Sequence, residues 1–223
     1  PCSTSIIYCC TPGEEIVAGS YNNLPKATMI ISSLRFVVLF FAGVRFSRAN
    51  VLHLRNSRDS PRPWKRFTFP RAEIEAAGYS CEVFGQKSWN GVAVLSRLPV
   101  EEIRRGLPGD DADEQARYIE AVVMGDRHAV TVAGLYLPNG NPAPGPKYDY
   151  KLAWMDRLRQ RGAELLATEQ PVMMLGDYNV IPEPRDAARP ENWVDDALFL
   201  PESRAAFRAL VNLGLTDAVR ALA

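Results

Sequence analysis

The stretch that most constrains the fold is residues 171–180, with the sequence PVMMLGDYNV. Residues 172–175 are apolar throughout and end at Gly176, which predicts a short strand buried on both faces. Polar residues follow at once. Asp177 and Asn179 stand two apart, so both side chains would point to the same side if the chain stayed extended. The sequence therefore predicts an inner strand with a polar tip.

The polar tip has two interpretations. A carboxylate and a carboxamide held together can activate a water and orient a phosphate or a metal-bound ligand. Gly, Asp and Asn are also the commonest turn residues, so GDYN is typical of a plain turn as well. The four letters alone favour the turn.

Helix-like and strand-like segments alternate from Phe67 to the end of the chain. Helical periodicity predicts helices over 71–77, 148–168 and 202–213, the first and last closed by Gly78 and Gly214. Strands are predicted over 79–84, 91–95, 118–123 and 129–137, the last two joined as a hairpin. This alternation indicates an α/β or α+β core.

The first 66 residues have a different composition. Between Ile16 and Ala72 the only acidic residue is Asp59, against ten basic ones. Residues 47–66 are rich in Arg, Ser and Pro, which is typical of a nucleic-acid arm, of a solvated linker, or of sequence foreign to the fold. We favour the last two, and expect residues 1–66 to be non-native or disordered and 67–223 to be a partial domain.

The cellular environment is predicted from two observations. The four cysteines show no metal-type spacing, as expected of free thiols in a reducing cytosol. Residues 27–44 are apolar enough for a membrane span, but Arg35 near its middle would cost about 2.5–3.5 kcal/mol. We expect a cytoplasmic protein with no membrane partner; the family resemblance described next implies a bacterial one.

Six blocks in this order resemble exodeoxyribonuclease III, the bacterial exonuclease and AP endonuclease of the endonuclease/exonuclease/phosphatase superfamily. They are 85–97 (GQKSWNGVAVLSR), 104–121 (RRGLPGDDADEQARYIEA), 134–142 (GLYLPNGNP), 151–158 (KLAWMDRL), 174–182 (MLGDYNVIP) and 195–217 (DDALFLPESRAAFRALVNLGLTD). The resemblance runs from about Phe67 to Ala223. It implies a four-layer sandwich of two packed β-sheets flanked by helices, incomplete here at both ends.

The resemblance implies roles for individual residues. Asp177 would draw a proton from the attacking water, Asn179 would hold that water or the scissile phosphate, and the Tyr136 hydroxyl would contact the phosphate. From the sequence alone Tyr136 is an ordinary strand aromatic. DNA contacts are implied for Asn139, for the loop residues Gln86, Lys87 and Asn90, and for the cations Arg104, Arg105, Arg117, Lys147 and Lys151. The loop is otherwise a solvated turn, and each cation is as readily a plain surface charge.

The implied cofactor is Mg²⁺ or Mn²⁺. The resemblance implies an N-terminal strand that ends in Asn and a second strand that ends in Gln-Glu, whose carboxylate binds the metal. Neither is recognisable here, and the only glutamates before Glu73 are Glu14 and Glu15. Neither closes a predicted strand, so the metal ligand stays unknown, with Asp177 and Asn179 as candidates.

The implied function is a monomeric DNA repair nuclease. It would act on double-stranded DNA with abasic sites or 3′ ends, as a 3′ to 5′ exonuclease and abasic-site endonuclease. The alternatives are another phosphodiesterase or phosphatase of the superfamily, and a non-catalytic DNA-binding remnant.

Overall fold

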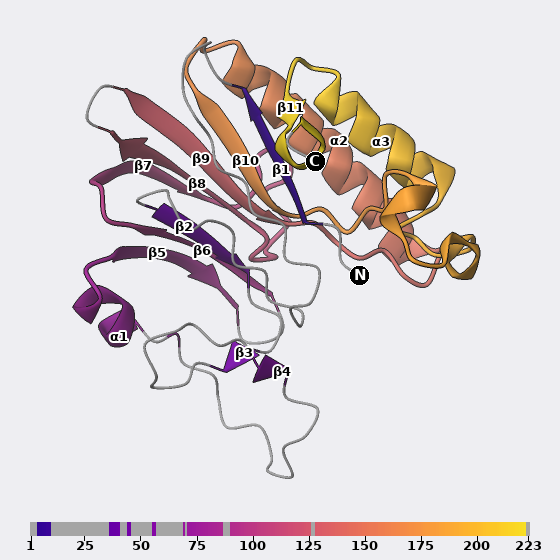
Figure 1. Ribbon diagram of the computed structural model, residues 1–223, viewed down its shortest axis with the longest axis horizontal. Coiled ribbons are helices and arrows are strands. Elements are labelled where there is room, and N and C mark those ends of the chain that lie inside the picture. Colours follow the sequence, from indigo (N-terminus) through magenta and orange to yellow (C-terminus); the bar gives the residue numbers. More distant parts are fainter. Residues whose placement is uncertain are drawn as a thin grey trace.

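The structure is a computed structural model that describes residues 4–9, 36–40, 44–45, 55–56, 69, 71–86, 90–125 and 128–221. Its elements form four layers (Figure 1): helices α2 and α3, a six-stranded sheet, a three-stranded sheet, and helix α1. The predicted sandwich of two sheets flanked by helices is confirmed.

The six-stranded sheet has the order β11-β1-β10-β9-β8-β7. Its strands are β1 (Thr4–Cys9), β7 (Val100–Arg105), β8 (Tyr118–Met124), β9 (Ala129–Tyr136), β10 (Val172–Asp177) and β11 (Thr216–Asp217). Only β9 and β10 pair in parallel. A parallel pair needs a long crossover, which here is α2 (Pro146–Leu166). The carboxyl ends of β9 and β10 therefore lie at the same edge of the sheet.

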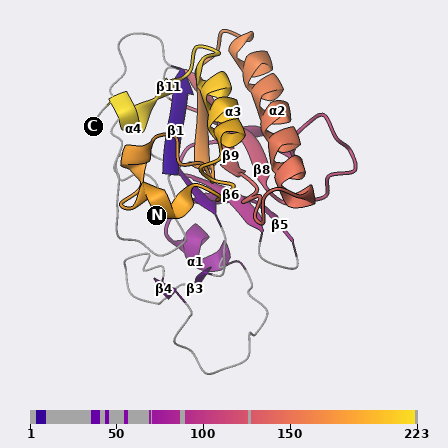
Figure 2. The same ribbon diagram turned by 90° about the vertical axis from the view of Figure 1, so that its right-hand side faces the viewer.

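The three-stranded sheet has the order β2-β6-β5, formed by β2 (Phe36–Phe40), β5 (Ser80–Gly85) and β6 (Gly91–Ser96). The remaining elements are β3 (Val44–Arg45), β4 (Arg55–Asn56), α1 (Arg71–Ala76), α3 (Pro201–Val211), α4 (Ala218–Ala221) and two 3₁₀ turns at Pro184–Asp186 and Pro190–Trp193. Figure 2 shows α2 and α3 lying side by side.

Strand β10 is buried on both faces, as predicted. Val172 and Met174 belong to the core beneath α2 and α3, while Met173 and Leu175 belong to the core between the two sheets. The alternation follows from the two-residue period of a strand. A continuous apolar run was therefore the correct signal for this inner strand.

The predicted helices and strands from Arg71 onward are present, with ends shifted by a few residues. Strand β7 was not predicted, since its sequence VEEIRR does not alternate. The structure gives the reason: the pairing register shifts between Glu101 and Arg104, and Glu102 has a positive φ of 49°. A bulge breaks the two-residue period that sequence analysis relies on.

Four strands, β1 to β4, lie in the described part of the first 66 residues. Two of them join the main sheets, β1 beside β10 and β2 beside β6. The division of the chain at residue 66 stays a prediction. Among the residues placed by the structure, no helix combines the length and the apolar character needed to cross a membrane.

One buried ion pair fixes α2 against the sheet. Arg161 of α2 donates to both carboxylate oxygens of Glu120 in β8, at 2.7 and 3.0 Å, and the Tyr118 hydroxyl donates to the same carboxylate at 2.6 Å. Burial acts to raise the pKa of Glu120, but these donors outweigh it and the pKa is lowered. The inner face of α2 is thereby held in one rotational position.

Candidate active site

Asp177 and Tyr136 lie side by side at the edge where β10 and β9 end. They are register partners in the parallel pair, so their side chains leave the same face of the sheet. That face packs against the second sheet, and Tyr136 borders the core between the sheets. Both residues are partly exposed. The structure therefore brings the predicted base and the predicted phosphate contact together.

Gly176 allows this close pairing. A Cβ built at this position would lie 2.1 Å from the carbonyl oxygen of Leu135 on the neighbouring strand. No side chain fits at that distance from a backbone atom, so the glycine of GDYN has a packing role as well as ending the apolar run.

The chain turns between Asp177 and Asn179 instead of staying extended. Asn179 has a positive φ of 44°, and its N–H donates to Asp177 Oδ1 at 2.9 Å. Asn and Asp adopt this conformation more readily than most residues because their short side chains bond to nearby backbone. The extended backbone that the sequence suggested is therefore replaced by a turn. Asp177 and Asn179 therefore form a turn and also belong to the candidate site.

The Asn179 side chain is buried, with the residue only 3% exposed. Its Nδ2 donates to the Leu137 carbonyl at 2.7 Å, and its Oδ1 accepts from Asn139 Nδ2 at 3.4 Å. Asn139 is itself exposed. The loop after β9 and the loop after β10 are thus joined through two of the predicted site residues.

Lys151 is not a surface cation, and the expectation that it contacts the DNA backbone is wrong. The residue is 0% exposed. Its ammonium donates to the carbonyls of Asn179, Ala197 and Asn139, at 2.6, 3.0 and 3.1 Å. Burial lowers the pKa of Lys151 to about 7, while the carboxylates of Asp196 and Asp177 act in the opposite direction. The sequence misled because a lysine on a helix is usually exposed.

Arg117 lies against Tyr136. Its guanidinium carbon is 5.1 Å from the centre of the Tyr136 ring, and it donates to the Tyr136 carbonyl at 3.2 Å. Burial lowers the pKa of Arg117 from its usual value, against the opposing effect of Tyr136, Tyr150 and Asp113. A cation over an aromatic ring is attracted by the negative face of the ring, so the contact fixes the ring orientation.

The predicted DNA-facing loop reaches Arg117 through one intermediary. Arg117 Nε donates to Gln115 Oε1 at 2.6 Å, and Asn90 Nδ2 donates to the same oxygen at 3.2 Å. Gln86 is exposed, and its Oε1 accepts the N–H of Ala116 at 2.7 Å. Lys87 lies outside the residues that the structure describes.

Three other predicted DNA contacts are exposed. Arg104 and Arg105 lie on β7, at the end of the six-stranded sheet, and Arg105 pairs with Glu82 at 2.7 Å. Lys147 lies in the first turn of α2. Their exposure is compatible with binding an anionic surface.

Several residues beside Arg117 were not predicted from the sequence. Gln115 links the loop to Arg117, and Asp113 accepts the Tyr150 hydroxyl and pairs with Arg157. Burial and the adjacent Asp113 raise the pKa of Tyr150. Asp113, Gln115 and Arg117 all lie in the DADEQAR stretch. Their alternate spacing in that stretch was the available signal.

A complete metal site is not formed by the residues that the structure describes. Within those ranges no group of three or more His, Cys, Asp or Glu side chains is placed to hold an ion. Asp177 supplies one carboxylate, and the Asn179 amide is committed to Leu137 and Asn139. Asp177 can therefore supply one ligand of a bound Mg²⁺, which in proteins is held by one or two carboxylates together with phosphate oxygens and waters.

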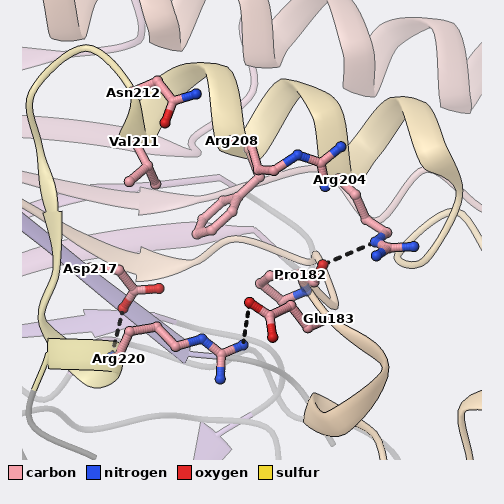
Figure 3. A pocket seen from close by; sticks show the side chains of 9 residues that line it. Pro182, Glu183, Arg204, Arg208, Val211, Asn212, Asp217 and Arg220 are labelled. Atoms are coloured by element: carbon pink, nitrogen blue, oxygen red, sulfur yellow. Dashed lines mark hydrogen bonds and ion pairs between the residues drawn. The ribbon is translucent and has the colours of Figure 1, made fainter.

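A separate pocket lies beside α3 (Figure 3) and contains none of the predicted site residues. Arg204 of α3 donates to the Pro182 carbonyl at 2.9 Å, and Arg220 pairs with Glu183 and Asp186 across the opening. The pocket is lined by Pro182, Glu183, Arg204, Phe207, Arg208, Val211, Asn212, Asp217 and Arg220. Arg204 and Arg220 already pair with neighbouring carbonyl and acidic groups, so we do not assign the chemistry to this pocket.

The chain belongs to the Endonuclease/Exonuclease/phosphatase family, whose model matches residues 21–216. Within that family it is 32% identical, over 161 residues, to Exodeoxyribonuclease III of Haemophilus influenzae, covering 69% of this chain and 60% of that protein. It is 27% identical to Exodeoxyribonuclease of Bacillus subtilis, covering 60% of this chain and 51% of that protein. The predicted resemblance is confirmed, and the chain spans only about half to three-fifths of these relatives.

Solved structures show the same likeness. The 3′-5′ exonuclease NExo of Neisseria meningitidis has a TM-score of 0.64 at 35% identity, covering 69% of this chain and 58% of that one. An AP endonuclease of Archaeoglobus fulgidus has a TM-score of 0.63 at 32% identity, with the same coverage. These structures share the fold over most of this chain.

Proposed function

We propose that this chain is the larger part of a DNA repair nuclease that hydrolyses phosphodiester bonds in duplex DNA, at abasic sites and at 3′ ends. The observation that carries the proposal is the register of Asp177 with Tyr136 at the open edge of two parallel strands. Support comes from relatives named as exodeoxyribonucleases and AP endonucleases, and from NExo, described as a 3′ phosphatase bound to a product DNA hairpin.

In the proposed reaction Asp177 is the general base. A carboxylate takes a proton from the water that attacks phosphorus, and the bond to the leaving oxygen of the DNA strand breaks. The turn orients the carboxylate, because Asp177 Oδ1 is fixed by the Asn179 N–H at 2.9 Å. Tyr136, held by Arg117, presents a hydroxyl that stabilises the charge developing on the phosphate oxygens.

A divalent cation belongs to the same proposal. Mg²⁺ or Mn²⁺ would neutralise charge on the phosphate. Asp177 would supply a carboxylate ligand at this edge, together with phosphate oxygens of the substrate and waters. We derive no step through the metal.

The proposal is tested with Asp177→Asn and a DNA duplex carrying one abasic site. The amide keeps the shape of the side chain but cannot take a proton, so we expect nicking to fall by about 10²- to 10⁴-fold. EDTA should abolish nicking by the unaltered chain. The matched control is Asp156→Asn, an exposed carboxylate on α2 that bonds to Arg159 and Gln160.

Two outcomes would contradict the proposal. One is abasic-site nicking that Asp177→Asn leaves unchanged. The other is hydrolysis of a phosphoinositide with no action on abasic DNA or on 3′ ends, which would indicate a different branch of the superfamily.

A further inference from the structure

Three loops meet at one buried ammonium group. Lys151 Nζ donates to Asn139 in the loop after β9, to Asn179 in the turn after β10, and to Ala197 in the segment before α3. A lysine ammonium has three hydrogens, so these three carbonyls satisfy it completely. Two of the three acceptor residues are themselves predicted site residues.

The loop after β9 closes directly over the stem of this lysine. Gly140 has a φ of +91°, and a Cβ there would lie 2.7 Å from Lys151 Cδ and 3.1 Å from the Ala197 Cβ. Only a residue without a side chain can cross at this distance. The loop therefore packs closely against the lysine side chain.

Every polar group of Asn179 is fixed from a different direction. Its carbonyl accepts from Lys151, its N–H donates to Asp177, and its side chain bonds to Leu137 and Asn139. The Asn179 peptide thus connects the ammonium to the carboxylate of Asp177. Without the ammonium, the carbonyl would be left buried without this donor and the turn could relax.

We propose that Lys151 is a positioning residue of the nuclease reaction. Its hydrogen bonds to backbone carbonyls fix the Asp177 turn and the Asn139 loop relative to one another. This inference rests on the proposed function. The three bonds join residues from three separate loops, so we expect their removal to move the turn and the loop as well as to lower stability.

The test is Lys151→Met in the full chain, because methionine fills the stem but removes the charge. A shift of about 1 Å in a catalytic group costs about 100-fold, so we expect kcat on abasic DNA to fall by that order while KM changes by less than about threefold. The plot of log binding constant against log salt concentration should keep its slope. If Lys151 contacted a phosphate directly, its removal would instead reduce the magnitude of that slope by about 1.

The matched control is Arg159→Met, which removes an exposed cation two turns along the same helix and should leave kcat and KM unchanged. A second variant, Gly140→Ala, keeps the ammonium but presses on its stem. It should also lower kcat with the salt slope unchanged. This variant tests the inference even if Lys151→Met fails to fold. Amide hydrogen exchange over residues 177–181 should be faster in both variants, which is a readout independent of activity.

The possible failures are distinguishable. If the unaltered chain does not cleave abasic DNA, the proposed function fails, and hydrogen exchange still decides whether Lys151 holds the turn. If the unaltered chain is active and both variants keep its kcat, the positioning role is wrong. A raised KM with a reduced salt slope in Lys151→Met would also overturn it, in favour of a direct phosphate contact.

Discussion

The two sides of the candidate site are built differently. The acid side, residues 176–181 with Lys151 and Asn139, is held by buried groups, and Lys151 and Asn179 are 0% and 3% exposed. The platform side, made of Tyr136, Arg117, Gln115 and Asn90, is partly exposed and is held mainly by contacts between side chains.

The two sides differ in how freely their groups can move. Buried hydrogen bonds leave a group little choice of position, because breaking one exposes an unsatisfied polar atom. Partly exposed contacts can be exchanged for water at low cost. We infer that the acid side is fixed before substrate binds, whereas the platform side can adjust to the bound strand. Substitutions on the acid side should therefore change folding and activity together, and those on the platform side activity alone.

The largest effect is expected from Gly176→Ala. The added methyl group would lie 2.1 Å from the Leu135 carbonyl oxygen, so β9 and β10 must separate at the site. We expect a loss of about 3 kcal/mol in the free energy of unfolding, at the upper end for overpacking. That corresponds to a fall of about 10 °C in Tm in a chain of this size, and little nicking should remain. The control is Gly85→Ala, which would meet no atom within 4 Å. An unchanged Tm in Gly176→Ala would remove the basis for calling the acid side rigid.

A smaller effect is expected from Arg117→Met. The change removes the cation over the Tyr136 ring and the bonds to Gln115 and to the Tyr136 carbonyl. We expect kcat to fall by about 10-fold through misplacement of the Tyr136 hydroxyl. Stability should change by less than about 1 kcal/mol, since an apolar residue replaces a desolvated charge. Thermal melts and steady-state rates on the same preparation check both parts. A loss of stability as large as that of Gly176→Ala would contradict the inference that substitutions on the platform side change activity alone.

The smallest effect is expected from Gln115→Leu. Gln115 Oε1 accepts hydrogen bonds from both Asn90 and Arg117. The change therefore separates the loop that carries Asn90 from Arg117, while Asn90 and Arg117 each keep other contacts. We expect KM for abasic DNA to rise by about threefold, in line with the loss of the Asn90 bond that holds the loop. We expect kcat to stay within twofold, because Arg117 loses its bond to Gln115 but keeps its contacts with Tyr136. Titration of kcat and KM with one duplex is sufficient. A fall in kcat larger than that of Arg117→Met would show that the loop, not the guanidinium, orients Tyr136.

Much of this arrangement could be predicted from the sequence, because apolar periodicity is a local signal. The inner strand at 172–175 and the helix carrying Lys151 follow from the spacing of apolar residues. The pairing of Asp177 with Tyr136 came only from the resemblance, since the two residues lie 41 positions apart in the chain and no local pattern links them. The burial of Lys151 could not be predicted, because it depends on three loops that meet only in the folded chain.

The bulge in β7 has a consequence for association. This strand ends the six-stranded sheet, and its side chains Glu101, Glu102, Arg104 and Arg105 are exposed. Charged side chains and an irregular backbone prevent a second chain from adding a strand there. The open side of the sheet is thus protected against edge-to-edge aggregation while still presenting two arginines to a polyanion.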